Sequence, residues 1–234
     1  MPRQPRLELP GIPLHVTQRG VNRCAIFLDD ADRHHYRRLL RDACRKHGVA
    51  IHAFVLMDNH VHVLVCATEA GRVSRAMRQA GQSYVQSFNQ RHGRVGTLWQ
   101  GRFKSSLVDS GAYALRVIRY IELNPVRAAL VDRPDAYRWS SVHTHLGLAQ
   151  DPLLTPHPVY TGLGQDRSSR AGARREWLLS PLDPQELARI RAYMTQEKAL
   201  GDARFQAMVE KALNRPAAVR PRGRPRGETG AELG

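Results

Sequence analysis

The spacing of apolar and polar residues divides the first 125 positions into seven segments. Leu14–Arg19 alternates between apolar and polar residues, and two short apolar runs lie on either side of the turn Met57-Asp58-Asn59. Alternation and short apolar runs of this kind predict β-strands. The expected strands are 14–19, 49–56, 60–66 and a strand that ends near residue 108.

Three further segments carry apolar residues three and four positions apart, as on one face of an α-helix. The expected helices are 30–47, 71–91 and 111–123. Pro125 stops the third helix, because proline cannot donate a backbone hydrogen bond, and it biases Asn124 away from helical geometry.

The order of these segments is strand, helix, strand, strand, helix, strand, followed by one more helix. This βαββαβ order predicts a ferredoxin-like α+β fold, with an antiparallel four-strand sheet and two helices on one face. The first and third strands are central in such a sheet. The strand at 60–66 is therefore expected to be central, with one face free of the two core helices.

The C-terminal third has a different composition. Residues 151–180 are rich in Pro, Gly and Ser and are typical of a linker or an extended wrap. Two helices are expected after Asp183 and Asp202, either as simple packing or as a helix-turn-helix DNA reader. We therefore expect a folded domain at 1–150, a linker and helical extension at 151–214, and a disordered basic tail at 215–234.

That tail contains five arginines and no acidic residue between Arg215 and Gly227. Its segment Arg222-Gly223-Arg224-Pro225-Arg226 resembles the core of an AT-hook, in which arginines enter a narrow minor groove. The alternative is a disordered tail that binds DNA without regard to sequence.

The balance of charge indicates a polyanionic partner. The chain has 234 residues, 36 basic and 21 acidic, a net charge of +15 and a pI near 10.8, while 42% hydrophobic residues suffice for a core. Nucleic acid is the usual partner of such a surplus, although a membrane surface also attracts basic proteins. No apolar run approaches the ~20 residues of a membrane span, and the first ten residues lack a signal-peptide core. Three scattered cysteines argue against a disulfide framework, so we expect a cytoplasmic protein.

His60 and His62 are the first candidates for chemistry. Side chains alternate along a strand, so both imidazoles project from one face and could share a divalent cation. The alternative is a pair of half-buried polar residues. Two ligands are too few for most protein metal sites, so a third must come from elsewhere.

The third helix offers that ligand and a nucleophile. Tyr120 and Asn124 are one helical turn apart on one face, and an asparagine oxygen is a competent ligand for Mg²⁺ or Mn²⁺. By periodicity alone, Tyr120 is equally compatible with an aromatic side chain that anchors the helix.

Two loops carry cations that could contact DNA, and in one of them aromatic residues alternate with basic ones. Trp99 is followed by Arg102 and Lys104, and aromatic rings among cations can stack on bases while the cations contact phosphates. The alternative is buried aromatics flanked by surface charge. Arg19 and Arg23 supply two more cations beside the first strand.

Five motifs together resemble a known family. The motifs are the segments 15–20 (HVTQRG), 57–62 (MDNHVH), 96–104 (GTLWQGRFK), 120–128 (YIELNPVRA) and 139–141 (WSS). With them the sequence resembles the single-tyrosine HUH (IS200-like) transposases, and is most similar to the REP-associated tyrosine transposases of bacteria. The motifs occur in the order typical of the family and extend over about 14–142, so residues 1–150 would be its catalytic domain.

This resemblance implies a function and a site. Tyr120 would be the catalytic nucleophile, and His60, His62 and Asn124 the ligands of a Mg or Mn ion. In related insertion-sequence transposases the third ligand is a glutamine, so Asn124 departs from that pattern. Arg127 lies in the tyrosine motif and joins Arg19, Arg23, Trp99, Arg102, Lys104, Arg222, Arg224 and Arg226 as the expected DNA-binding set.

The expected activity is metal-dependent cleavage and rejoining of single-stranded, hairpin-forming DNA such as REP-like repeats, through a 5′-phosphotyrosine. The alternatives are a non-enzymatic nucleic-acid-binding protein and a metal-dependent nuclease in which water attacks. No membrane partner is expected. Related transposases act as dimers that exchange tyrosines or as monomers, so a monomer and a homodimer both remain open.

Overall fold

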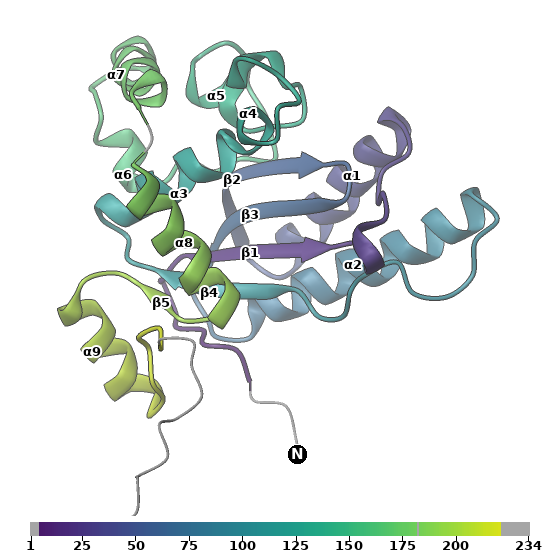
Figure 1. Ribbon diagram of the computed structural model, residues 1–234, viewed down its shortest axis with the longest axis horizontal. Coiled ribbons are helices and arrows are strands. Elements are labelled where there is room, and N and C mark those ends of the chain that lie inside the picture. Colours follow the sequence, from purple (N-terminus) through teal and green to yellow (C-terminus); the bar gives the residue numbers. More distant parts are fainter. Residues whose placement is uncertain (1–4, 182, 221–234) are drawn as a thin grey trace, which may run out of the picture.

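A single mixed sheet with helices on both faces forms the body of the protein (Figure 1). The computed structural model describes residues 5–181 and 183–220. The sheet order is β2-β3-β1-β4-β5, and its first four strands are antiparallel. The strands are β1 (Leu14–Arg19), β2 (Val49–Met57), β3 (His60–Ala67), β4 (Lys104–Val108) and β5 (Ala199–Leu200). β1 and β3 are central, as expected.

The helices follow in the expected order. Those of the core are α1 (Asp30–Lys46), α2 (Arg72–Arg91), α3 (Ala112–Glu122) and α4 (Asn124–Arg127), and those beyond it are α5 (Val142–His145), α6 (Pro158–Thr161), α7 (Arg167–Leu179), α8 (Pro184–Gln196) and α9 (Ala203–Leu213). Short 3-10 turns cover Val21–Arg23 and Pro134–Ala136. None of the helices within 5–181 and 183–220 has the length and hydropathy that a membrane span requires.

Two hydrophobic cores lie on opposite faces of the sheet. Val61, Val63 and Val65 point to one face, where they are fully buried under α1 and α2. The other face carries Val55 and Leu64, packed against α3 and α8. The ferredoxin-like expectation is thus confirmed for α1 and α2. The opposite face is free of those two helices, but α3 and α8 cover much of it.

The sheet has five strands where four were expected. The additional strand, β5, pairs in parallel with β4 and comes from the C-terminal extension. A two-residue strand is too short to produce a hydrophobic pattern, so the sequence carries no signal for it.

Residues 158–179 form α6 and α7, in place of the expected linker. The Asp166 side chain accepts a hydrogen bond from the Ser169 backbone N–H, and the Ser169 side chain bonds back to Asp166 in a capping box. At the start of α6, the His157 side chain accepts a hydrogen bond from the Val159 backbone N–H. These local caps begin two helices in a segment whose Gly, Pro and Ser content is typical of linkers.

The tyrosine helix is interrupted at Leu123, two residues before Pro125, and helical geometry resumes at once. α3 ends at Glu122, and α4 begins immediately at Asn124. Proline is tolerated in the first turn of a helix because its missing N–H would have no helical partner there. The expectation that Asn124 is non-helical is therefore wrong, and this residue opens a new turn.

α8 and α9 begin at the expected caps, Asp183 and Asp202. β5 separates them, and α8 packs against β4 and β5 on the sheet. The AT-hook-like residues Arg222, Arg224 and Arg226 lie outside the described residues.

Candidate active site

The two histidines of β3 lie together on the face that α3 covers. Their ring centres are 5.2 Å apart, and His62 is buried while His60 is partly exposed. In the antiparallel register, Arg19 of β1 stands opposite His60 and Thr17 opposite His62. Strand alternation and pairing thus place four polar side chains on one small area of an otherwise apolar sheet.

A third imidazole, from His15, completes this group. His15 Nε2 lies 2.9 Å from His62 Nδ1, and the His15 side chain is only 1% exposed. His60 Nδ1 lies 2.7 Å from the side-chain oxygen of Asn59, to which it donates. With Nδ1 of both strand histidines engaged, each has Nε2 left for a ligand, the arrangement that metal-binding histidines usually show.

Burial keeps the three imidazoles neutral. It lowers the pKa of His15 to about 3, with a further contribution from the Arg127 cation. Burial and the neighbouring Arg19 lower the pKa of His60 to about 4, while an interaction with the Asn124 side chain opposes the shift. The pKa of His62 is also lowered, first by burial and then by His15. Neutral imidazole is the form that binds metals.

Tyr120 faces these histidines from α3. Its ring centre lies 5.8 Å from that of His62 and 5.7 Å from that of His15, both edge-on. The Arg127 guanidinium carbon lies 4.0 Å from the centre of the tyrosine ring, and Arg127 Nη1 donates to the Tyr120 carbonyl at 2.8 Å. The α3–α4 bend therefore brings a cation onto the candidate nucleophile.

Asn124 is buried next to the same site. Its side-chain nitrogen has no hydrogen-bond partner among the described residues. An unpaired buried amide costs about 1–3 kcal/mol, which favours a role in binding something that the chain alone does not provide. The predicted site residues His60, His62, Tyr120 and Asn124 are thus brought together from one strand, β3, and from the helices α3 and α4, which lie about 60 positions further along the chain.

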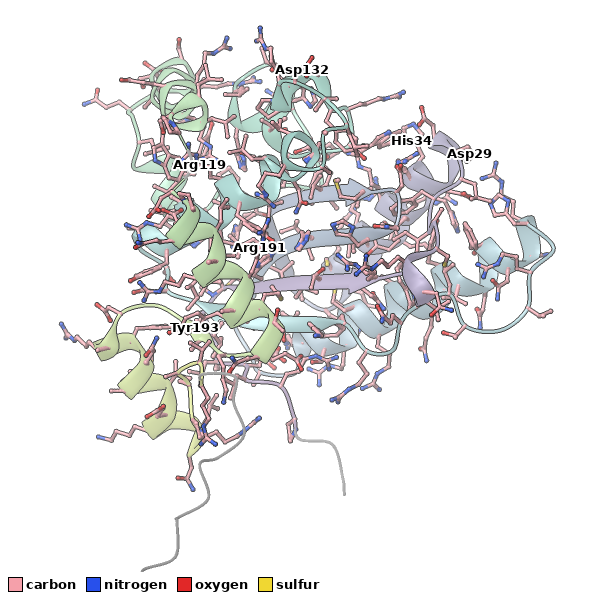
Figure 2. All side chains as sticks on the ribbon, in the orientation of Figure 1. Asp29, His34, Arg119, Asp132, Arg191 and Tyr193 are labelled. Atoms are coloured by element: carbon pink, nitrogen blue, oxygen red, sulfur yellow. The ribbon has the colours of Figure 1, made fainter. Side chains whose placement is uncertain are left out.

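A cavity of about 480 Å³ opens beside Tyr120 and His62. Four cationic side chains line it: Arg19, Arg102, Lys104 and Arg191. Arg191 belongs to α8, which crosses in front of the sheet in Figure 2. None of the lining residues is acidic, so the cavity suits a phosphate backbone.

A larger groove of about 790 Å³ adjoins this cavity, and Gln18, Gly101 and Arg102 line both. Trp99 and Phe103 also line the groove, but each is more than nine-tenths buried. Trp99 Nε1 donates to the Gly81 carbonyl, and the Arg6 guanidinium covers the Phe103 ring at 3.5 Å. A stacking role for Trp99 stays a prediction, since most of its ring is core.

Behind the tyrosine helix lies a buried charged cluster. Glu122 is fully buried and accepts hydrogen bonds from Arg174, His145 and Ser141. Burial by itself would raise the pKa of this carboxyl, but Arg174 and His145 outweigh it and lower the pKa to about 2. The carboxylate is therefore charged at neutral pH.

Sequence reasoning missed several of these residues. His15 could have been found, because pairing the first and third strands in antiparallel order places it on the face of His62. Arg191 and the partners of Glu122 had no such signal, because they come from helices whose packing on the sheet no local pattern encodes. Arg23 lies exposed beyond the end of β1, and Asn59 donates to its carbonyl.

Comparison with known proteins identifies a family. The model of the family described as "Transposase IS200 like" matches residues 10–124, which contain both strand histidines, Tyr120 and Asn124. The chain belongs to the IS200-like transposases. No curated protein sequence matches this transposase.

Comparison with solved structures adds a match in fold. A REP-associated tyrosine transposase bound to a REP hairpin has a TM-score of 0.52 and 20% identity, covering 68% of this chain and 93% of that one. A putative transposase from Deinococcus radiodurans R1 has a TM-score of 0.37 and 16% identity, covering 55% and 92%. The first supports the same fold.

Proposed function

We propose that this transposase cleaves and rejoins single-stranded, hairpin-forming DNA through a covalent bond between Tyr120 and a 5′-phosphate. The observation that carries the proposal is the convergence of Tyr120 and His62 on one cavity lined by four cationic side chains. The similar structure bound to a REP hairpin supports DNA of this kind as the substrate.

The donor set suits one divalent ion. Nε2 of His60 and of His62 would hold it, with the amide oxygen of Asn124 as a third ligand, since the Asn124 side chain is buried and interacts with His60. In the described part of the chain, no group of three or more His, Cys, Asp or Glu side chains could hold a metal, so an amide or the substrate must complete the shell. When bound there, Mg²⁺ or Mn²⁺ would act as a Lewis acid on a phosphate oxygen.

The reaction itself is an exchange of phosphoester bonds. The Tyr120 oxygen bonds to phosphorus as its proton is lost, and the bond from phosphorus to the 3′-oxygen breaks. That oxygen takes up a proton and leaves as a 3′-hydroxyl. Because the phosphotyrosine retains the ester, a second 3′-hydroxyl can reverse the step and join new strands, and no nucleotide cofactor is consumed.

Arg127 would stabilise the negative charge that forms on the tyrosine oxygen. Its guanidinium already lies over the ring and is partly buried, so the interaction is stronger than in water. Arg19, Arg102 and Lys104 would contact phosphates on either side of the scissile bond. Arg23 would extend this contact along the end of β1.

The site is composed of residues from one chain, which supports a tyrosine that acts in cis and a monomer as the active unit. A homodimer that exchanges its tyrosine helices would have to remove Tyr120 from its place beside His15 and His62.

The test is an adduct assay. A hairpin oligonucleotide labelled at its 3′ end, incubated with Mn²⁺ or Mg²⁺, should yield a labelled band at the protein's mass plus DNA under denaturing conditions. Tyr120→Phe should abolish the band, while Tyr113→Phe, two turns earlier on α3 and outside the cavity beside Tyr120, should retain it. EDTA should prevent its formation.

Other outcomes would favour the alternatives. An adduct that persists in Tyr120→Phe would refute the assigned nucleophile. Cleavage without any adduct would favour a nuclease in which water attacks. Hairpin binding with neither cleavage nor adduct would favour a non-enzymatic DNA-binding protein.

A further inference from the structure

A buried ion cluster connects the C-terminal extension to the helix that carries Tyr120. The Glu122 carboxylate accepts from Arg174 Nη2 at 2.5 Å and from Ser141 Oγ at 3.0 Å, and His145 Nδ1 donates to it. Both Glu122 and Arg174 are completely buried. Three segments distant in sequence, α3, 141–145 and α7, thus meet at one carboxylate.

Aromatic and backbone contacts hold α7 in this place. The Trp177 ring has the Arg174 guanidinium carbon 4.9 Å from its centre and that of Arg119 at 5.0 Å. Arg119, labelled in Figure 2, also donates to the Ser180 carbonyl just beyond α7. Tyr160 donates to the carbonyl of His145 at 2.9 Å. The extension is therefore attached to α3 at more than one point.

Glu122 lies on the side of the helix opposite to Tyr120 and Asn124. It lies two residues after Tyr120 and two before Asn124, and two residues in a helix correspond to a rotation of about 200°. Tyr120 and Asn124 consequently face the histidines, while Glu122 points away from them into the cluster.

This turn has little backbone support of its own. α3 ends at Glu122, and Pro125 has no N–H to offer the carbonyl four residues before it. The tyrosine and the amide lie on either side of this break. Their relative position must then depend on side-chain anchors, and Glu122 is the buried anchor between them.

We propose that Glu122 and Arg174 are positioning residues, through which α7 of the extension sets the alignment of Tyr120 and Asn124 toward the histidines. The proposal rests on the proposed function for its kinetic consequence, but the placement of the ring can be measured without catalysis. Neither residue lines the cationic cavity beside Tyr120. Losing the cluster should therefore slow the reaction without weakening hairpin binding.

The experiment compares Arg174→Met with a matched control, Arg170→Met. Arg170 lies one turn earlier on α7, and its side chain donates to the carbonyls of Gly164 and Gln165, away from the Glu122 cluster. At saturating hairpin DNA, Arg174→Met should form the adduct about 10- to 100-fold more slowly than wild type, as a misplacement of about 1 Å can cause. Its hairpin affinity should stay within about twofold. Arg170→Met should match wild type in both measurements.

A second readout reports the position of the ring directly. With 3-fluorotyrosine at position 120, wild type and Arg170→Met should give one sharp ¹⁹F resonance, while Arg174→Met should shift or broaden it. If Arg174→Met does not fold, Glu122→Gln, which has the same shape without the charge, replaces it with the same expectations. Arg174→Lys should restore part of the wild-type rate.

The two proposals fail in different ways. An unchanged ¹⁹F spectrum in the folded Arg174→Met or Glu122→Gln variant would overturn the positioning role, whatever the enzyme's activity. Equal slowing by the Arg174 and Arg170 variants would also overturn it. A wild-type protein that forms no adduct would refute only the proposed function, since the spectrum would still measure the anchor.

Discussion

Acidification should destabilise this transposase in part through His15, and the size of that effect follows from its burial. The pKa of a histidine in an unfolded chain is about 6.5, whereas burial and Arg127 lower that of His15 to about 3 in the fold. Between these values the unfolded state binds a proton that the folded state does not. The contribution of His15 to the free energy of unfolding is therefore fully present above pH 6.5 and is lost as the pH falls toward 3.

The magnitude can be worked out at pH 5. There the unfolded histidine gains about 2 kcal/mol from protonation, while the folded one gains almost nothing. This is a substantial part of the free energy of unfolding of a typical domain, which is about 5–15 kcal/mol. Carboxylates contribute little at this pH, because most of their titration lies lower. Other histidines whose pKa the fold lowers, such as His60, add losses of the same sign.

Urea unfolding at pH 8 and at pH 5, in EDTA to remove divalent metal, measures the effect. The stability lost between the two pH values should be about 2 kcal/mol smaller in His15→Gln than in wild type. His34→Gln, exposed on α1 and labelled in Figure 2, is the control and should retain the full loss. Equal losses in wild type and His15→Gln would refute the conclusion that the fold holds His15 neutral.

Three further predictions concern the scaffold. Asp32→Ala should cost about 3 kcal/mol in urea unfolding, because Arg91 and His92 lose the buried carboxylate that they share, whereas Asp42→Ala in an exposed pair should cost under about 1 kcal/mol. Gly81→Ala should raise stability by about 0.5–1 kcal/mol, since the added Cβ meets its neighbours at ordinary contact distances within a helix, and a loss of stability would contradict this. Cys44 should resist a thiol reagent at pH 8 until the protein unfolds, because burial raises the pKa of its thiol to about 12, and prompt labelling of the native protein would argue otherwise.

Local patterns were sufficient for most of the core. Alternation located β1 and β3, periodicity located α1, α2 and α3, and the βαββαβ order produced the central position of the histidine strand. The pair His60 and His62 followed from strand geometry alone, because neighbours two apart must share a face. The spacing of Tyr120 and Asn124 followed from the helix in the same way.

What the sequence by itself determined is therefore the set of elements and the faces on which their chemistry lies. Only the tertiary structure decided what those faces meet. The contact of His15 with His62 and that of Arg127 with Tyr120 depend on strand pairing and on the bend at Pro125. The buried ion pair of Glu122 and Arg174 joins residues 52 positions apart. β5, from the C-terminal extension, pairs with β4 at the edge of the sheet. Such contacts arise from the packing of whole elements, which short-range periodicity does not encode.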